Sequence, residues 1–397
     1  MTEPLAAASR ADEGEYKAQL EHKISRVKDL FQGFQLPELE IFESQRSHYR
    51  MRAEFRVWHQ DDETNYIMFD TREKAGSEAK QIKVETFPVG TRLLNDLMAK
   101  LMVEIKQKPI LRIKLYQTNF HTTLSGEAII TLIYHKKLDA EWSEAAEALR
   151  TQLGSLEGCS QEKPFIVGRS RKQKVELGGS AVTEQLIVDG RSFSYQQLEG
   201  SFSQPNAGVC QHMLGWARRA SEDLEGDLLE LYCGNGNFTV ALADIFRKVL
   251  ATEVAKSGVA SAHENLKANA VTNAFVARLS SEEFTSAWKK ERAFSRLQGT
   301  NLDTYDLQTI LVDPPRAGLD PKTMELLSEF QNIIYISCNP DTLKANLQQI
   351  SDSHDISKFA LFDQFPYTHH IECGVLLCKQ AATAAAKKRK LEGTALV

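Results

Sequence analysis

The chain has few cysteines, and their spacing forms no recognisable framework. Its six cysteines stand at positions 159, 210, 233, 338, 373 and 378. The absence of paired spacing argues against a disulfide scaffold, so we expect reduced thiols and a cytoplasmic protein. Only one cysteine precedes position 210, which excludes a four-cysteine metal or iron–sulfur cluster in the first half. We expect no metal site.

Long hydrophobic runs and net positive charge are also lacking. No apolar stretch is long enough to cross a bilayer or to form a signal peptide, so we expect no membrane association. The formal net charge of -5 excludes a globally basic nucleic-acid binder, and any RNA partner must be met by local patches. With 397 residues, 42% of them hydrophobic, the chain can bury the core of one large or two ordinary domains.

The second half of the chain alternates predicted strands and helices. This alternation, with apolar strands and amphipathic helices, predicts a doubly wound α/β domain. A helix at 205–222 precedes the strand–helix pairs 227–232 and 237–247, 248–252 and 256–269, 308–312 and 321–330, and 332–336 and 340–351, and the strands 358–363 and 373–378 close the sheet.

The first half predicts a separate α+β region. We therefore expect an N-terminal region over residues 1–195, with residues 1–13 frayed, a Rossmann-like domain over 196–380, and a disordered tail over 381–397. The expected helices of the first half are 14–35, 88–107 and 139–153, and the expected strands are 47–58, 66–69, 110–117, 126–134 and several short ones within 164–196.

The strand at 47–58 carries arginines on one face. Arg50, Arg52 and Arg56 alternate with apolar residues, and Phe120 is expected in an exposed loop between two later strands. Arginines beside an exposed aromatic ring are typical of RNA-binding surfaces, because cations contact phosphates while rings stack on bases. The same pattern also fits an ordinary solvated sheet face, and both interpretations stay open.

Cys338 lies in the sequence YISCNP, residues 335–340. An apolar, β-branched strand precedes it, while Asn339 can cap a helix and Pro340 can occupy its first turn. A cysteine at a strand's carboxyl end, ahead of a helix start, is placed for reaction, and the helix start favours the thiolate. The alternative is a buried structural thiol.

The sequence LELYCGNGNF, residues 229–238, predicts a strand followed by a glycine-rich turn and a helix. Gly234 and Gly236 allow close approach of a ligand, while Thr239 stands where a dinucleotide fingerprint has its third glycine. Glu253, at the end of the next strand, can accept both hydroxyls of a ribose. On this fold, the combination resembles the S-adenosylmethionine site of class I methyltransferases.

Two further carboxylates follow predicted strand boundaries. Asp313, in DPPR, comes directly after a strand, where two prolines fix a turn, so it either points into the ligand crevice or caps that turn. Glu372, in HIEC, stands at the entrance of the last strand and is a candidate base, although a glutamate there is commonly a surface residue.

The four motifs LELYCGNGNF, DPPRAGLD, YISCNP and HIECGVLL, in this order, resemble the RNA 5-methyluridine methyltransferase family. SHYRMRAEFR and SFSQPN resemble its tRNA branch, and the resemblance spans nearly the whole chain. The branch that modifies ribosomal RNA often carries an N-terminal iron–sulfur cluster, whose cysteines this chain lacks. The resemblance implies that Cys338 is the nucleophile and Glu372 the base, and that the S-adenosyl-L-methionine pocket is lined by Gln204, Tyr232, Asn237, Glu253 and Asp313.

The resemblance implies methylation of uridine C5 at position 54 in the T-loop of tRNA, and in the tRNA-like arm of transfer-messenger RNA. The reaction would pass through a covalent adduct of Cys338 with uracil C6, which Glu372 resolves. We expect a monomer that binds the T-arm. The alternatives are the same chemistry on ribosomal RNA, an amino- or cytosine-methyltransferase, because DPPR is similar to the D/N-P-P-Y motif, and a non-catalytic RNA-binding or chaperone protein.

Overall fold

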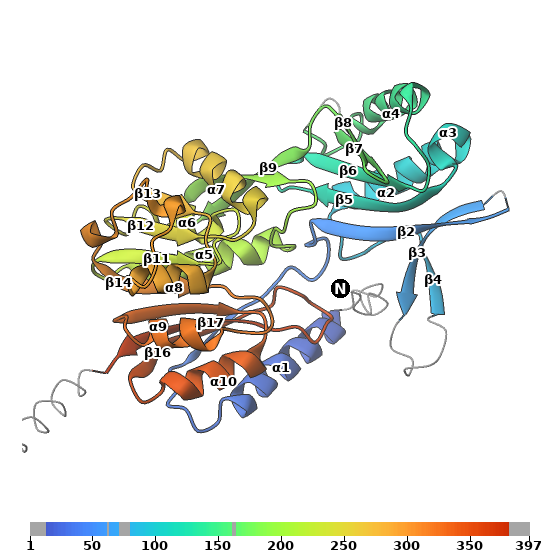
Figure 1. Cartoon of the computed structure of the whole chain (residues 1–397). Helices are drawn as coiled ribbons and strands as arrows, with labels where there is room; N and C mark the ends of the chain where they lie inside the picture. Colours follow the sequence, from blue (N-terminus) through green and yellow to red (C-terminus); the bar gives the residue numbers. More distant parts are fainter. Residues whose placement is uncertain (1–12, 62, 71–79, 161–163, 381–397) are drawn as a thin grey trace, which may run out of the picture. The chain divides into compact units, whose positions relative to one another are not determined.

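The computed structural model describes residues 13–61, 63–70, 80–160 and 164–380 (Figure 1). The predictions for the extreme N-terminus and for the tail after residue 380 concern segments outside these residues. The chain divides into two compact units, each built from separated segments. Unit 1 comprises Met1–His22, Ser44–Gln211 and Gln364–His369, and unit 2 comprises Lys23–Glu43, His212–Asp363 and His370–Val397. The expected division into one domain over residues 1–195 and another over residues 196–380 stays a prediction.

Unit 2 is built on an eight-stranded sheet in the order β1-β16-β17-β15-β14-β11-β12-β13. Neighbouring strands are parallel except for β17, which runs antiparallel to both β15 and β16. The strands are β1 Leu39–Phe42, β11 Asp227–Leu231, β12 Val249–Thr252, β13 Ala274–Ala277, β14 Leu307–Val312, β15 Asn332–Ser337, β16 His354–Phe362 and β17 Glu372–Lys379.

The chain reverses its direction of travel across the sheet between β11 and β14. From β11 it moves outward through β12 to β13, and from β14 it moves the other way to β15. In sheets of this kind, right-handed crossovers place the helices of the two halves on opposite faces, and ligands bind at the carboxyl ends of the strands where the order reverses, which here are β11 and β14. The helices are α5 Ala207–Ser221, α6 Asn237–Leu242, α7 Lys256–Ala268, α8 Ser281–Trp288, α9 Pro321–Leu327 and α10 Pro340–Ile350, with short 3-10 turns η1 Ser295–Leu297 and η2 Leu302–Thr304.

The central strands of unit 2 are apolar throughout because both faces are covered. Ile310, Leu311 and Val312 of β14 are fully buried, as are Ile333 and Ile334 of β15. Continuous apolar runs of this kind are typical of parallel strands covered by helices on both faces. The predicted strand–helix alternation and doubly wound fold are therefore confirmed. The short strands β1 and β13 and helix α8 were not predicted.

Helix α10 begins as the sequence predicts. The side chain of Asn339 accepts a hydrogen bond from the backbone N–H of Asp341 at 3.2 Å, and Pro340 occupies the first helical position. Pro340 has no N–H to leave unpaired there, so the helix can start directly after Cys338.

Unit 1 contains a seven-stranded sheet in the order β4-β3-β2-β5-β6-β7-β8 and a separate β9–β10 hairpin. Only β6 and β7 run parallel in the larger sheet. Helices α2, α3 and α4 lie together against it (Figure 1). The bounds are α1 Glu13–Leu30, which continues into unit 2, β2 Arg52–Gln60, β3 Glu63–Asp70, β4 Lys80–Val84, α2 Arg92–Gln107, α3 Pro109–Arg112, β5 Leu115–Thr122, β6 Ala128–Tyr134, α4 Ala140–Leu153, β7 Phe165–Ser170, β8 Gln173–Leu177, β9 Ala181–Val188 and β10 Arg191–Leu198.

Phe120 corrects the prediction of an exposed loop aromatic. The expected loop is part of β5, where Phe120 pairs with Ala53 of β2 and Ile130 of β6. Phe120 is only 1% exposed, and its ring packs against Phe55 and Tyr66 in the core beneath the helices. The prediction was wrong because a strand continues through the segment, and the pleat directs every second side chain inward.

The arginines of β2 are less open than the sequence indicates. The Arg52 guanidinium donates to the carbonyl oxygen of Ser201 at 2.5 Å and to Ser203 Oγ at 3.2 Å. Burial lowers the pKa of Arg52. Arg52 therefore fastens the loop that carries Phe202, whose side chain is 72% exposed. The prediction that Arg52 is displayed on an open face is wrong.

Candidate active site

Three of the predicted site residues lie side by side, directly after the ends of neighbouring strands in the sheet of unit 2. Leu231 of β11 pairs with Thr252 of β12 on one side and with Val312 of β14 on the other. The next residues along these strands are Tyr232, Glu253 and Asp313. They consequently lie together at the carboxyl edge, at the point where the strand order reverses, which is the usual place for a ligand on such a sheet.

The turn after β11 has an unusual backbone. Tyr232 has a φ of 62°, and Gly234 and Gly236 have φ values of 57° and 79°. A left-handed conformation at a tyrosine is costly and persists only where the surrounding structure enforces it. The Tyr232 hydroxyl donates to Ser281 Oγ at 2.8 Å, which fixes the side chain. A Cβ at Gly236 would come within 3.3 Å of Ala262, so glycine permits this close approach.

Glu253 is tied to the same turn. Its carboxylate accepts hydrogen bonds from the backbone N–H of Gly234 at 3.0 Å and of Ala255 at 2.6 Å. Gly258 makes room for the side chain, because a Cβ there would lie 2.9 Å from Glu253 Cγ. The half-buried carboxylate still has acceptor capacity, and two vicinal ribose hydroxyls are donors that suit it.

The remaining predicted cofactor residues lie in two places. Asn237 is half-buried and opens α6, next to the glycine-rich turn. Gln204 belongs to unit 1, where its Oε1 accepts a hydrogen bond from Gln364 Nε2 at 2.6 Å. The structure therefore brings Tyr232, Asn237, Glu253 and Asp313 to one edge of the unit 2 sheet, and it places Gln204 in the other unit.

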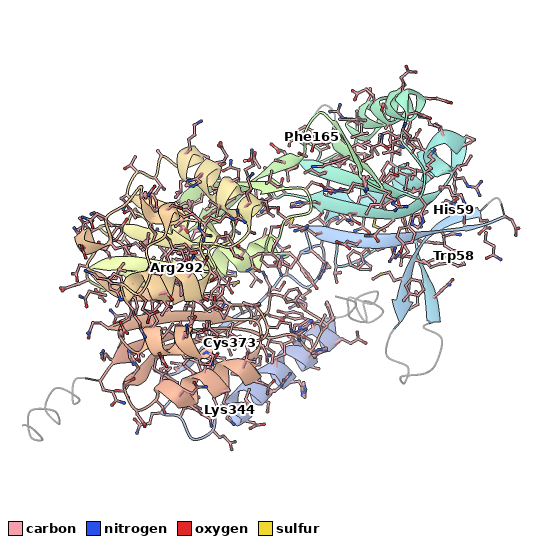
Figure 2. The ribbon with its side chains drawn as sticks, viewed as in Figure 1. Trp58, His59, Phe165, Arg292, Lys344 and Cys373 are labelled. Atoms are coloured by element: carbon pink, nitrogen blue, oxygen red, sulfur yellow. The ribbon has the colours of Figure 1, made fainter. Side chains whose placement is uncertain are left out.

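Cys338 and Glu372 lie at the same edge. Ser337, the last residue of β15, pairs with Cys373 of β17, which is labelled in Figure 2. Cys338 therefore follows the end of β15 at the edge where β17 begins with Glu372. The charge of Glu372 acts on the Cys338 thiol, so the two groups lie within electrostatic reach of each other. Glu372 is buried and Cys338 is half-buried.

Three acidic groups meet at this edge, and burial raises the pKa of each. Burial first, and then the charges of Glu372 and Asp313, raise the pKa of the Cys338 thiol to about 11, while Arg316 opposes them. Burial raises the pKa of Asp313 to about 7 and holds the pKa of Glu372 well above its ordinary value, with Asp313 adding to the effect. The prediction that the helix start makes Cys338 a thiolate is therefore wrong, because burial and two carboxyl groups outweigh it.

These pKa shifts indicate which kind of ligand this edge of the sheet can bind. A cation among Cys338, Asp313 and Glu372 would lower all three pKa values, since a nearby positive charge favours the ionised forms. S-adenosyl-L-methionine carries a sulfonium cation and a ribose with two free hydroxyls. The carboxyl groups here and the Glu253 carboxylate match these two features, so the residues present fit this cofactor.

Sequence reasoning missed a buried pair beneath the glycine-rich turn. Glu230 of β11 is 1% exposed and accepts a hydrogen bond from Thr239 Oγ1 at 2.5 Å. Burial raises the pKa of Glu230 to about 8, and Asp313 and Glu253 act in the same direction. A lone carboxylate inside the apolar run 228–232 is the sequence signal that could have identified it.

Within the described parts of the chain, no cluster of three or more histidine, cysteine, aspartate or glutamate side chains could hold a metal ion. None of the helices described there combines the length and the apolar character needed to cross a membrane.

The strand order, the antiparallel β17, the glycine-rich turn and the acidic residue after β12 together define a class I S-adenosyl-L-methionine-dependent methyltransferase. A family profile described as tRNA (Uracil-5-)-methyltransferase matches residues 15–380. The chain belongs to this family, as the motif resemblance predicted. Methylation of tRNA uracil at C5 with S-adenosyl-L-methionine is the activity that goes with the assignment, and the ribosomal RNA alternative is not favoured.

Individual relatives agree with this assignment. A protein of Acinetobacter baylyi named tRNA/tmRNA (uracil-C(5))-methyltransferase is 52% identical over 364 residues, which cover 91% of this chain and 98% of the relative. A protein of the same name from Neisseria meningitidis serogroup B is 51% identical over 92% of this chain and 99% of its own. A solved tRNA (uracil-54, C5)-methyltransferase from Pyrococcus abyssi has a TM-score of 0.67 at 21% identity, covering 91% of this chain and 83% of that one, and it supports the fold.

Proposed function

We propose that this chain methylates C5 of the uridine at position 54 in the T-loop of tRNA, with Cys338 as nucleophile and Glu372 as base. The observation that carries the proposal is the pairing of Ser337 of β15 with Cys373 of β17, which brings the segments of these two groups to one edge of the sheet. The names of the relatives, tRNA/tmRNA (uracil-C(5))-methyltransferase, support transfer-messenger RNA as a second substrate.

The proposed chemistry begins at Cys338. Uracil C5 is a poor nucleophile, so the sulfur first attacks C6, forming a C–S bond while the π electrons of C5=C6 move toward the C4 carbonyl. C5 thereby becomes an enolate carbon. When bound, S-adenosyl-L-methionine supplies an electrophilic methyl group on a positively charged sulfonium.

Glu372 completes the reaction. After methylation, C5 carries both the new methyl group and its original proton, while C6 remains bonded to sulfur. The Glu372 carboxylate removes the C5 proton, the C5=C6 bond re-forms, and Cys338 leaves as a thiolate. Its place at the same edge as Cys338 supports this role, because one side chain must address C5 while the other holds the adjacent C6.

For the cofactor, we assign Glu253 to the ribose hydroxyls and Asp313 to the neighbourhood of the sulfonium. Tyr232 and Asn237, at the glycine-rich turn, would line the same pocket. The expected cofactor role of Gln204, which belongs to unit 1, stays a prediction. The hydrogen bonds of Glu253 to the turn support this assignment, since they fix the carboxylate before any ligand arrives.

For RNA, we assign the binding surface to unit 1. The Arg56 guanidinium lies 3.9 Å from the centre of the Tyr116 ring, and Tyr116 is 38% exposed. A guanidinium beside a partly exposed aromatic ring suits a phosphate beside a base. Phe202 offers a second exposed ring, and the target uridine must leave its stack to react. We expect the protein to act as a monomer.

The deciding experiment is incubation with labelled S-adenosyl-L-methionine and total tRNA, followed by nucleoside analysis. The expected product is 5-methyluridine, and a minimal T-arm hairpin should be methylated as well. Cys338→Ala should yield no product. If it still makes 5-methyluridine, the covalent mechanism is wrong, and an amino- or cytosine-methylated nucleoside would select the rival chemistry.

A non-catalytic RNA-binding protein would behave differently. It would bind tRNA whether or not its cofactor pocket is intact. Calorimetry should show cofactor binding to the wild type and none to Glu253→Ala, because removal of the carboxylate leaves two ribose hydroxyls unpaired. RNA binding without any cofactor binding in the wild type would favour the non-catalytic alternative.

A further inference from the structure

The mechanism proposed for Cys338 and Glu372 assigns no role to Arg316, which follows the two prolines of the DPPR motif. Its side chain is exposed, and its guanidinium makes no hydrogen bond or ion pair among the described residues. A guanidinium is well suited to pair with an anion. The Arg316 guanidinium is therefore available to an anion that forms during the reaction or arrives with the substrate.

The backbone of Arg316 is fastened to the segment that carries the nucleophile. Its carbonyl oxygen accepts hydrogen bonds from Asn339 Nδ2 at 3.0 Å and from Thr342 Oγ1 at 3.4 Å. Asn339 directly follows Cys338 and caps α10, while Thr342 lies in the first turn of that helix. The turn of Arg316 and the loop of Cys338 thus move as one piece.

The far end of the turn is fixed as well. Gly318 donates to the carbonyl oxygen of Pro315 at 2.9 Å with a φ of 78°, and a Cβ there would lie 3.0 Å from Asn346 Oδ1. The same Asn346 oxygen accepts from the backbone N–H of Leu319 at 3.3 Å and from the Tyr335 hydroxyl at 2.8 Å. A turn held at both ends keeps the root of the Arg316 side chain at a constant place relative to Cys338.

The charged groups around the Cys338 sulfur indicate a role for Arg316. Glu372 and Asp313 both disfavour a negative sulfur, whereas Arg316 is the cation that favours it. The attack on C6 needs a thiolate, and elimination regenerates a thiolate. The site therefore contains two groups that hinder the reactive form of the nucleophile and one that promotes it.

We propose that Arg316 is the counter-ion of the Cys338 thiolate. Its guanidinium stabilises the negative sulfur after the thiol proton has passed to water, and again when Cys338 leaves C6. This inference rests on the proposed role of Cys338 as nucleophile. Arg316 acts through the sulfur and does not contact the reacting carbons, so it is a positioning residue.

Alkylation of Cys338 by iodoacetamide tests the proposal without RNA. Peptide mass spectrometry of the full-length protein gives the rate for Cys338 from pH 6.5 to 10, with Cys378 in the same digest as an internal control. Arg316→Gln should slow alkylation of Cys338 about three- to tenfold at pH 7.5 and move its profile to higher pH, because a partly exposed charge shifts a neighbouring pKa by up to about one unit. Arg316→Lys should restore most of the rate.

A measurement on the wild-type protein tests the proposal even if the Arg316→Gln variant misfolds. Salt screens an exposed guanidinium more than buried carboxyl groups, so added salt should slow alkylation of Cys338 and leave Cys378 unchanged. An identical Cys338 profile in Arg316→Gln, or a salt-independent rate in the wild type, overturns the proposal. In that case a shallower salt dependence of tRNA binding in Arg316→Gln would assign Arg316 to a phosphate. Product formation by Cys338→Ala would instead overturn the proposed function, which the alkylation assay does not address.

Discussion

Ser337 of β15 pairs with Cys373 of β17, so Cys338 follows and Glu372 precedes this pair at one edge of the sheet. The proposed nucleophile and the proposed base therefore come from separate motifs, and the pairing of the two strands brings these motifs together. A register shift of one residue would turn Glu372 to the opposite face of the sheet. The chemistry of the site thus depends on the pairing of β17 as much as on the identity of either residue.

Glu372→Gln should separate the two halves of the reaction. Glutamine keeps the size of the side chain but cannot take up the C5 proton, so the variant should attack and methylate once and then stall as a covalent protein–RNA complex. A denaturing gel should show a slow band that requires cofactor and Cys338. Turnover of this variant at the wild-type rate would remove Glu372 from the role of base.

Two arginines of β2 should affect RNA binding in different ways. Arg56→Ala should weaken tRNA binding and reduce the slope of log K against log salt by roughly one, because one phosphate contact is lost. Arg52→Ala should weaken binding with an unchanged slope, because Arg52 fastens the 201–203 loop and does not face RNA. The comparison needs filter-binding titrations at four salt concentrations. Equal slope changes in both variants would contradict this distinction.

Glu230 should make the fold less stable at alkaline pH. Its pKa rises from an ordinary 4.5 to about 8, so between these values the folded protein holds a proton that the unfolded chain has lost. Stability contributed by this group is complete below pH 4.5 and decreases as pH rises through the window to about 8. Glu230→Gln keeps the contact with Thr239 and should raise the unfolding midpoint at pH 8.5 more than at pH 5.

The exposed Glu225 provides a matched control for this prediction, because it lies two residues before β11 on the surface. Glu225→Gln should leave the pH dependence of the urea midpoint as in the wild type. Equal pH profiles for Glu230→Gln and the wild type would show that Glu230 ionises in the folded protein as it does in the unfolded chain.

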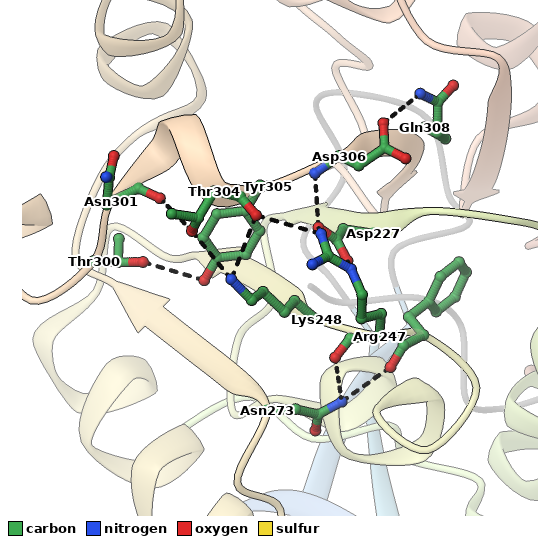
Figure 3. Close-up of polar contacts among 11 residues, drawn as sticks. Asp227, Arg247, Lys248, Asn273, Thr300, Asn301, Thr304, Tyr305, Asp306 and Gln308 are labelled. Carbon is green, nitrogen blue, oxygen red and sulfur yellow. Dashed lines mark hydrogen bonds and ion pairs between the residues drawn. The ribbon is translucent and has the colours of Figure 1, made fainter.

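Asp227 holds the opposite end of β11 (Figure 3). Its fully buried carboxylate accepts from Arg247 Nε at 3.0 Å, from Arg247 Nη2 at 2.5 Å and from the backbone N–H of Asp306 at 2.7 Å. Asp227→Asn would set an amide N–H₂ against these donors and should destabilise the fold by about 2–4 kcal/mol in urea unfolding. Lys290→Ala, which breaks a solvent-exposed pair with Asp303, should change little, and equal losses would refute the assignment.

The sequence was most informative where local rules and tertiary structure agree. The strand and helix that flank Cys338 were predicted because an apolar run, an asparagine cap and a proline occur in succession, and each acts over a few residues. The edge that gathers Tyr232, Glu253 and Asp313 was predictable as well, since parallel strands in a doubly wound sheet present their carboxyl ends together.

Other features depend on partners that are distant in sequence. The sequence predicts a loop around Phe120, where the neighbours Asn119 and His121 are polar. The pairing of β5 with β2 and β6 shows instead a continuous strand, in which Asn119 and His121 lie on the face opposite to Phe120. The alternating pattern of β2 predicts an open Arg52. Its contacts with Ser201 and Ser203 do not show in that pattern, because these residues lie 149 and 151 positions later in the chain. The raised pKa of Cys338 likewise comes from burial and then from Glu372 and Asp313, and the sequence specifies neither the burial nor these distances.

The place of β17 in the sheet has a consequence for synthesis of the chain. β17 is the last described strand, yet it lies between β15 and β16, which are made before it. While residues beyond 371 are still inside the ribosome, the sheet has a gap at this position, and Cys338 has neither Glu372 nor the strand beside it. On the proposed mechanism, an unfinished chain therefore cannot complete a methylation cycle, because the base arrives only when β17 enters the sheet.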